Sequence, residues 1–270
     1  MRPQSMGLRM SLPILSWLLL TVAGSAAAAG PCEATSPSHV VPLVELYTAE
    51  GCSDCPPADK WLSQLAASSD PTQATPLALH VDYWNEHGWV DPYSDPAFTK
   101  RQDFRVHLAK KKVRYTPHVM VGADTSVNWR DEGEVGRVLS KTRKAEAGVD
   151  LGLKVARLAD GLQVEVKALP KPSSVPEKSP NMLWLALYQD GLTSKISDGE
   201  NKGRTLHHDR VARTLQGPWE LRAQPVDGKV KVPLPAGASL EDYGFVLFAE
   251  SSETGDGLQS LGLPLGTCSL

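Results

Sequence analysis

The pattern of hydrophobic residues is clearest around the C-x-x-C motif formed by Cys52 and Cys55. Apolar side chains crowd residues 40–46, as in a buried strand, and then recur at helical spacing through residues 58–65. Gly51 and the motif lie between these two segments. The pattern predicts a strand, a turn, a cysteine loop and a helix, in that order.

Two adjacent prolines, Pro56 and Pro57, limit where this helix can begin. Proline has no N–H group and is tolerated only in the first turn of a helix, where that group would have no intrahelical acceptor. We therefore expect the helix to begin near Ser53 or Asp54, with Cys52 just outside it. The position suits a dithiol enzyme, because the free N–H groups and the dipole of a helix N-terminus stabilise a thiolate.

The rest of the N-terminal half alternates strands with helices. The same signals predict a central buried strand at 77–81, a helix from Asp95 to a basic end at 110–112, a strand at 119–121 after Pro117, a short polar strand or hairpin at 125–129, and a closing helix at 132–147. Residues 82–96 have no clean period and are interpreted as a loop. Its aromatic side chains cover the domain in one interpretation and form a substrate-binding lip in the other.

From residue 149 the pattern changes to the alternation of strands. Residues 151–155 and 162–166 alternate around an Asp-Gly turn, which is a strong hairpin signal. Further short strands are expected at 182–188, 229–234 and 245–248. Several short strands separated by turn residues favour an antiparallel β-sandwich. We place the boundary between the two domains near Gly148.

Residues 1–29 have the pattern of a secretory signal peptide. A basic start precedes the apolar run at 12–22, and small residues follow up to Ala29, the expected cleavage site. A membrane anchor is the alternative, but the apolar run is shorter than the roughly 20 residues that span a bilayer. We expect residues 30–38 to form a linker and the protein to be periplasmic or secreted, with no stable membrane insertion after cleavage.

The composition and charge exclude one class of partner. The formal net charge is −3 and 41% of the residues are hydrophobic, which is ordinary for a globular protein. Without a basic surface, nucleic acid is not an expected partner. The sequence does not determine the oligomeric state.

The four cysteines allow three pairings. Cys52 and Cys55 are close enough to pair locally, which leaves Cys32 and Cys268 near the two ends of the exported chain. We predict that these two form a structural disulfide, worth roughly 4 to 5 kcal/mol in the chain-entropy model. Two free thiols are the alternative, since sequence does not establish proximity.

A C-x-x-C motif by itself also fits zinc sites and structural bridges. A zinc site would need a second cysteine or histidine pair at suitable spacing, which the other two cysteines do not provide. His80 or His118 could join the motif around copper, although their apolar surroundings favour buried, hydrogen-bonded histidines. No cofactor is expected. The order of elements, with Thr116 and Pro117 before the third strand, is instead thioredoxin-like.

The sequence predicts an α/β thioredoxin-like domain at 39–148, followed by an all-β, sandwich-like domain at 149–270. Three segments, LVELYTAEGCSDCPPAD, HVDYWNEHGWVDPYSDPAFTKRQ and YTPHVMVGA, resemble an exported thioredoxin-like family of unknown function with C-x-x-C-P-P-A-D, H-V-D-Y-W and Y-T-P motifs. The resemblance extends into GENKGRTLHHDRVARTL at 199–215. It implies a thioredoxin fold and disulfide chemistry.

In the wider thioredoxin superfamily a cis-proline lies against the active disulfide, and Pro117 matches its position. The resemblance is incomplete at the cysteine loop. Gly51 replaces the usual aromatic residue, and Ser53 and Asp54 replace Gly-Pro. The redox potential therefore does not carry over.

Each residue of the expected site has a role. Cys52, the more exposed of the pair, would be the nucleophilic thiolate, and Cys55 would resolve the mixed disulfide. Asp54 opposes the helix dipole, so the thiol pKa of Cys52 should be less depressed than in strongly oxidising relatives. Pro117 would hold the substrate backbone beside the sulfurs, and Thr116 would modulate access.

The expected function is an exported thiol–disulfide oxidoreductase acting on protein or small-molecule thiols and disulfides. The alternative is a binding module in which the cysteine pair is structural and binds copper, or in which the β-domain contacts a protein partner. A second polar segment, residues 199–213, is interpreted as a hydrogen-bonded loop between the domains, with a functional site as the alternative. Its neighbours His207 and His208 would point to different sides of a strand, which makes joint metal binding awkward.

Overall fold

The computed structural model describes residue 1 and residues 32–174, 180–235 and 237–270. Apart from Met1, the predicted signal peptide and its cleavage site lie outside the described residues. Within the described ranges, no helix is long and apolar enough to cross a membrane.

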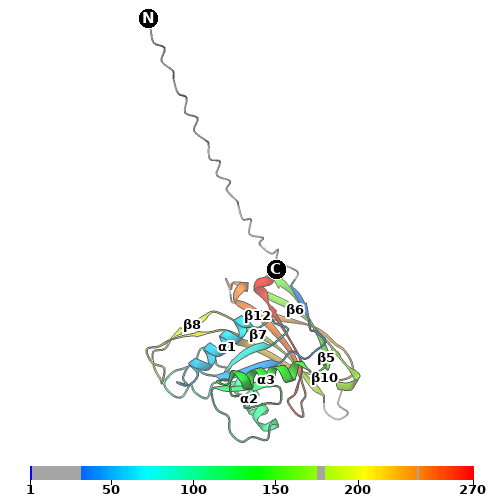
Figure 1. The fold of residues 1–270 in the computed structure, drawn as a ribbon, viewed down its shortest axis with the longest axis horizontal. Coiled ribbons are helices and arrows are strands. Elements are labelled where there is room, and N and C mark those ends of the chain that lie inside the picture. The colour runs from blue at the N-terminus through cyan, green and yellow to red at the C-terminus, as the bar shows by residue number, and fades with distance from the viewer. Residues whose placement is uncertain (2–31, 175–179, 236) are drawn as a thin grey trace.

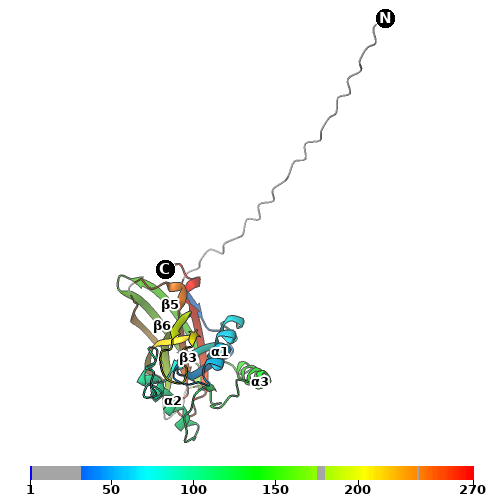
Figure 2. The ribbon, with the colours of Figure 1, turned by 90° about the vertical axis from the view of Figure 1, so that its left-hand side faces the viewer.

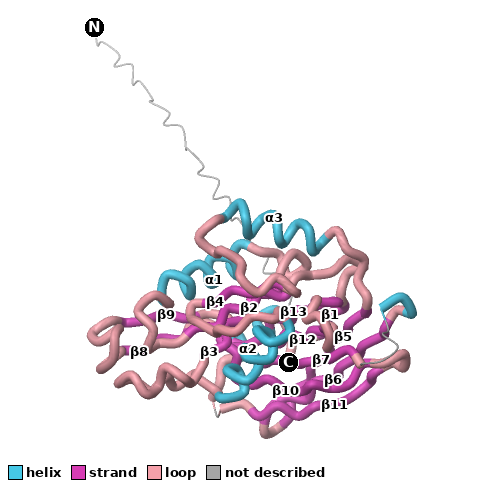
Figure 3. Tube along the Cα trace, turned by 90° about the horizontal axis from the view of Figure 1, so that it is seen from below, coloured by secondary structure: helices cyan, strands magenta, loops and turns pink. Residues whose placement is uncertain are grey.

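The strands of the described residues form two sheets and a separate hairpin (Figure 1). The larger sheet has the order β13 (Gly257–Pro264), β12 (Tyr243–Glu250), β7 (Asn181–Gln189), β10 (Val211–Leu221), β3 (Thr75–His80), β2 (Leu43–Thr48) and β4 (His118–Val121). The smaller sheet has the order β1 (Glu33–Thr35), β5 (Val149–Leu158), β6 (Gly161–Pro170) and β11 (Val226–Pro233). The hairpin pairs β8 (Leu192–Lys195) with β9 (Thr205–His208) and extends from one end of the molecule (Figure 3).

Three α-helices cover the N-terminal part of the larger sheet: α1 (Pro56–Ser68), α2 (Pro96–Leu108) and α3 (Glu132–Arg143). Val44 and Leu46 of β2 pack in one core cluster with residues of α1 and α3. Tyr47, whose side chain points to the other face, packs with Phe98 of α2. The predicted thioredoxin-like arrangement is therefore confirmed, with helices on both faces of a mixed sheet.

The C-terminal part is mostly β, as predicted. Alternate residues of β5 and β6 pack against β7, β12 and β13 in a single core cluster. Figure 2 shows β5 and β6 on one side of the molecule, and α1 and α3 on the other. Cys32, beside β1, is bonded to Cys268 near the C-terminus. Short 3-10 helices span Pro172–Ser174, Leu240–Asp242 and Leu265–Thr267.

The larger sheet continues across the predicted domain boundary near Gly148. Strand β10 from the C-terminal half pairs in parallel with β3 from the N-terminal half, through Val211 and Ala78. The backbone N–H of Ala78 also donates to the carbonyl of Arg210 at 2.8 Å. The two halves therefore share one sheet, and their division into separate folding units stays a prediction.

Helix α1 begins at Pro56, later than the start predicted near Ser53. Cys55 is its N-cap residue, and the two prolines occupy the first helical positions, where no N–H group is needed. The preceding residues form a turn in which the N–H of Cys55 donates to the carbonyl of Cys52 at 3.2 Å. The motif therefore lies on the approach to the helix.

Other predicted elements also differ from the structure. Residues 33–35 of the predicted linker form strand β1, and helix α2 ends at Leu108, before the basic residues 110–112. Residues 125–129 do not form a strand or hairpin, although the N–H of Val127 donates to the carbonyl of Val119. Helix α3 ends at Arg143 instead of residue 147, because the following backbone turns toward the N-terminal segment. There the N–H of Val40 donates to the carbonyl of Ala145 at 3.0 Å.

Candidate functional site

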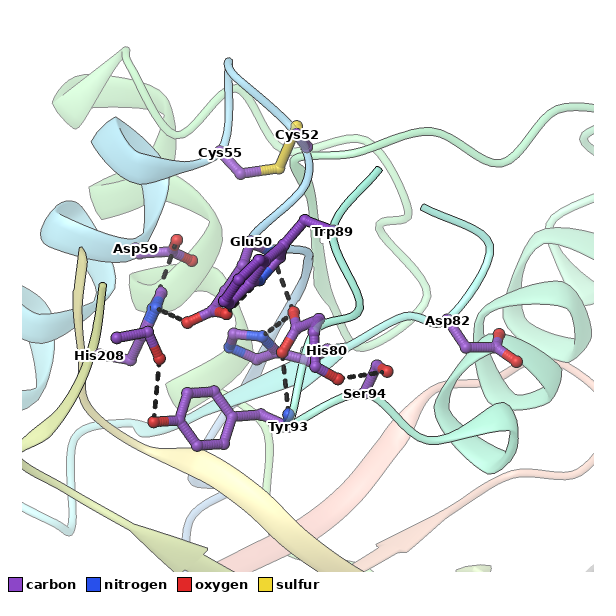
Figure 4. Close-up of polar contacts among 12 residues, drawn as sticks. Glu50, Cys52, Cys55, Asp59, His80, Asp82, Trp89, Tyr93, Ser94 and His208 are labelled. Carbon is purple, nitrogen blue, oxygen red and sulfur yellow. Dashed lines mark hydrogen bonds and ion pairs between the residues drawn. A yellow bond between two sulfur atoms is a disulfide. The ribbon is translucent and has the colours of Figure 1, made fainter. Parts of the chain in front are cut away.

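Cys52 and Cys55 form a disulfide at the N-terminus of α1 (Figure 4). We expected Cys52 to be exposed, but its exposed fraction is 2%, and that of Cys55 is 0%. Asp54, between them in the chain, is exposed. The disulfide is therefore buried, with a carboxylate on the solvent side of its loop.

Trp84, from the aromatic loop after β3, packs against the cysteine loop. Its indole N–H donates to the hydroxyl of Thr116 at 2.7 Å, and the peptide bond between Thr116 and Pro117 is cis. A side chain at Gly51 would bring a Cβ atom to 3.3 Å from the Cβ of Trp84. Glycine thus replaces the usual aromatic residue where Trp84 already occupies the space.

The polar segment at 199–213 also contacts the cysteine loop. The side-chain amide of Asn201 donates to the carbonyls of Glu50 and Cys52 at 2.8 and 2.9 Å. The carboxylate of Glu200 accepts a hydrogen bond from the N–H of Ser53 at 3.0 Å, and this bonding lowers the pKa of Glu200. This part of the segment is a hydrogen-bonded loop that joins the two halves of the chain.

The two neighbouring histidines of this segment point to opposite faces of β9. His207 is exposed and lies 3.1 Å from the hydroxyl of Thr193, whereas His208 is buried. The prediction that the two side chains point to different sides of a strand is therefore confirmed.

A cluster of buried ionisable groups lies below the disulfide in the view of Figure 4. His80 Nδ1 is 2.7 Å from Asp91 Oδ2, and His208 Nε2 is 3.1 Å from Glu50 Oε1. His208 Nδ1 is 3.6 Å from Asp59 Oδ2. All five side chains are at most 5% exposed, so their charges interact in a medium of low dielectric constant.

The pKa values in this cluster shift in different directions. Burial opposes protonation of His80, but the charge and hydrogen bond of Asp91 outweigh it and raise the pKa of His80. Burial acts against ionised Asp91 as well, yet the charge and hydrogen bond of His80 lower its pKa. Burial raises the pKa of Asp59, and the charges of His208 and His80 only partly offset it. The first pair therefore favours the charged forms, whereas burial makes the charged form of Asp59 less favourable than it is in water.

Both histidines that were considered for copper are buried and hydrogen-bonded within the protein. His80 contacts Asp91, and His118 contacts the carbonyl of Thr125 and the side chain of Gln102. In the described part of the chain, no group of three or more His, Cys, Asp or Glu side chains is arranged to hold a metal ion.

Sequence reasoning placed Trp84 in an aromatic loop and Asn201 in a polar segment, each with a functional role as one interpretation, but it did not connect them to the cysteine loop and did not identify Asp59. All three lie within the motifs that carry the family resemblance, which is the signal that could have found them. The spacing of hydrophobic residues along the chain did not point to these three side chains. Each of them contacts a residue distant in sequence or a buried polar group.

Two solved structures share the fold of this chain at low sequence identity. AGR_C_4864 from Agrobacterium tumefaciens is 22% identical, with a TM-score of 0.62 over 86% of this chain and 96% of that one. HBP35 of Porphyromonas gingivalis is 14% identical, with a TM-score of 0.64 over 87% of this chain and 78% of that one. No curated protein matches the sequence.

The family comparison covers most of the described residues. The family model described as "Protein of unknown function (DUF1223)" matches residues 43–250, which include the cysteine loop, the cis-proline turn and the segment around Asn201. The match thus spans both halves of the chain, as the shared sheet does. The chain belongs to the DUF1223 family.

Proposed function

We propose that this protein is an exported thiol–disulfide oxidoreductase that acts on protein or small-molecule thiols and disulfides. The observation that carries the proposal is the C-x-x-C disulfide at the N-terminus of α1, linked through Trp84 to a cis Thr116–Pro117 turn. Helix N-termini favour thiolates, so the reduced form has a reactive sulfur at this place. The leader pattern supports export to an oxidising compartment, where the disulfide is the resting form.

The reaction uses the two sulfurs in sequence. In the reductive direction, the Cys52 thiolate attacks a substrate disulfide, forms a mixed disulfide and releases one substrate thiolate. Cys55 then attacks the Cys52 sulfur, which releases the second substrate thiolate and restores the protein disulfide. The substrate gains two electrons and the protein loses two. The opposite direction uses the same steps in reverse.

Access to Cys52 requires a local rearrangement, because only 2% of this residue is exposed. Trp84 packs beside Gly51 of the cysteine loop, and the segment with Glu200 and Asn201 is attached to that loop by three hydrogen bonds. A substrate that displaces either segment reaches the sulfur. The two carboxylates nearby, Asp54 and Glu200, disfavour the thiolate and moderate its reactivity.

The direct test is turnover of insulin or glutathione by the purified protein and by Cys52→Ser. We expect the variant to lose turnover, because no thiolate remains to attack the substrate. A double variant, Cys32→Ser with Cys268→Ser, is the control, since it removes a disulfide outside the site. Equal turnover by wild type and Cys52→Ser would contradict the proposal.

Burial of both sulfurs supports a second candidate, a periplasmic binding module with a structural cysteine pair. In this case the module binds copper through the reduced pair, or a partner protein through the β-rich half. Metal analysis of the anaerobically reduced protein tests the copper form. If the module binds copper, the reduced wild type should contain a stoichiometric amount of copper and Cys52→Ser should contain none. An absence of copper from the reduced wild type would contradict the copper form.

A further inference from the structure

The connection between α2 and β4 contains a basic loop, residues 110–115 (KKKVRY), in which every residue is exposed. The loop has three lysines and one arginine and no acidic residue. Arg114 is balanced by Asp103, because one nitrogen of its guanidinium group donates to both carboxylate oxygens at 2.7 and 2.6 Å. The three lysines form no ion pair with any residue that the structure describes. The loop therefore has an excess of positive charge in a chain whose formal net charge is −3.

Helix α2 does not account for these lysines. Cations stabilise the C-terminus of a helix within its last turn, where Arg105 and His107 already lie. The helix ends at Leu108, and Lys110 follows in the left-handed region with a φ of 54°. Glycine adopts this backbone conformation at a lower cost, so the turn itself does not require a lysine. The charges of the loop thus have no evident role in the stability of the helix.

The basic loop also exposes two large hydrophobic side chains. Val113 is 68% exposed and Tyr115 is 46% exposed. They are two of the six large hydrophobic residues that the described part of the chain exposes. Protein interfaces combine apolar groups with cations in this way, and tyrosine and arginine are enriched in them. The loop therefore offers both attraction by charge and apolar area to a partner.

The second half of the loop is held in place by the protein. The ring of Tyr115 stacks on the imidazole of His118 with the ring centroids 4.1 Å apart, and its carbonyl accepts a hydrogen bond of 2.9 Å from the amide of Gln102. The guanidinium group of Arg114 lies 4.7 Å from the ring centroid of Tyr83. A partner would meet a surface that is already ordered, which lowers the entropic cost of binding.

We propose that the basic loop is the docking surface for an acidic segment of a partner protein. Carboxylates of that segment pair with the three lysines at 110–112, and its apolar side chains cover Val113 and Tyr115. Complementary charges of this kind accelerate association and select the partner. The partner binds through the N-terminal half of the chain, whether or not the cysteine pair is catalytic.

An anionic membrane is the other surface that attracts lysines. Segments that bind anionic lipids have clusters of about four to eight lysines or arginines. The basic loop has only its lysines free of ion pairs, and the ring of Tyr115 is stacked on His118 instead of being free to enter a bilayer. These features favour a protein over a lipid surface.

The test measures the binding of labelled synthetic peptides to the purified protein by fluorescence anisotropy. One peptide is rich in glutamate with interspersed leucines, a second has glutamine in place of glutamate, and a third has lysine there. The first variant combines Lys110→Gln, Lys111→Gln and Lys112→Gln, and the second is Val113→Ser.

The control variant combines Lys144→Gln, Lys154→Gln and Lys231→Gln. These lysines are exposed, lie outside the basic loop and form no ion pair with a described residue. The control therefore removes the same amount of charge from other parts of the surface. Every exchanged side chain is exposed, so all the variants are expected to fold, and their circular dichroism spectra check this.

We expect wild type to bind the acidic peptide at least about tenfold more tightly than the other two peptides. The loss of the three loop lysines should weaken this binding about tenfold and remove most of its dependence on salt between 50 and 300 mM NaCl. Val113→Ser should weaken binding about threefold with the salt dependence unchanged, because it removes apolar area only. The control should match wild type.

Three results would overturn the inference. The first is a wild type that does not prefer the acidic peptide, and the second is an equal affinity for it in wild type and the loop-lysine variant. The third is an equal loss in the control, which would make the attraction a property of the whole surface. Sedimentation with phosphatidylglycerol vesicles that depends on the loop lysines, without peptide binding, would assign the loop to a membrane. The assay involves no thiol reaction, so these outcomes leave the oxidoreductase proposal untouched.

Discussion

Asn201 lies in the C-terminal half of the chain, yet its side-chain amide donates a hydrogen bond of 2.9 Å to the carbonyl of Cys52. Asn201 is fully buried. The same amide also donates to the carbonyl of Glu50, so one side chain supports both ends of the turn that leads to the disulfide. The C-terminal half is therefore part of the candidate site.

Asn201→Ala should lower the free energy of unfolding by about 1–3 kcal/mol, because it removes the amide that donates to the buried carbonyl of Glu50 and one of the two donors to the carbonyl of Cys52. Urea denaturation of the oxidised protein measures this. Lys202→Ala is the matched control: this neighbouring side chain is exposed, and we expect a change within about 0.5 kcal/mol. Equal stability of both variants would show that water replaces the amide.

Arg101→Met should destabilise the protein by about 3–5 kcal/mol, because it leaves two buried carboxylates, Glu45 and Glu250, with Arg105 as their remaining cationic partner. The guanidinium group of Arg101 donates to Glu45 at 2.6 Å and to both oxygens of Glu250 at 2.8 and 3.0 Å. Arg114→Ala breaks an exposed ion pair with Asp103 and should cost about 0–1 kcal/mol. If the two variants lost similar amounts of unfolding free energy, the buried ion pairs of Arg101 would contribute no more than the exposed one.

Because His80 and Asp91 form a buried ion pair, we predict that the free energy of unfolding is greatest at an intermediate pH. The pKa of His80 is raised above 6.5, so its stabilising charge is complete below pH 6.5 and is lost as the pH rises through the folded-state value. The pKa of Asp91 is lowered below 3.8, so its contribution is present above pH 3.8 and is lost as the pH falls through its folded-state value.

Urea unfolding of wild type and His80→Asn between pH 3 and pH 9 measures this dependence. We expect the wild-type free energy of unfolding to fall above pH 6.5, and the variant to lack that fall. A variant with the same alkaline slope as wild type would assign the dependence to another group.

The disulfide between Cys32 and Cys268 closes almost the whole described chain into one loop. Replacing both cysteines by serine should lower the free energy of unfolding by about 4 to 5 kcal/mol in the chain-entropy model. Thermal unfolding followed by circular dichroism measures the loss. A double variant with an unchanged midpoint would show that the unfolded chain is compact enough to make the bridge unnecessary.

The elements around the cysteine motif could be predicted from the sequence because local signals determine them. The apolar run of β2, the helical spacing in α1 and the turn at Asp160 and Gly161 each depend on residues close together in the chain. The start of α1 was misplaced by the same local reasoning. The prolines show only that the helix begins at or before them, and the hydrogen bonds of the preceding turn decide between the positions.

The sequence by itself determined the order of strands and helices around the cysteine motif, the local pairing of Cys52 with Cys55, and the proline that follows Thr116. Only the tertiary structure decided that β10 joins β3, that Asn201 supports the cysteine loop, and that Asp59 is buried beside His208. Local elements follow from the period of side chains along the chain. Contacts between distant residues depend on how whole sheets and loops pack, which no local period encodes.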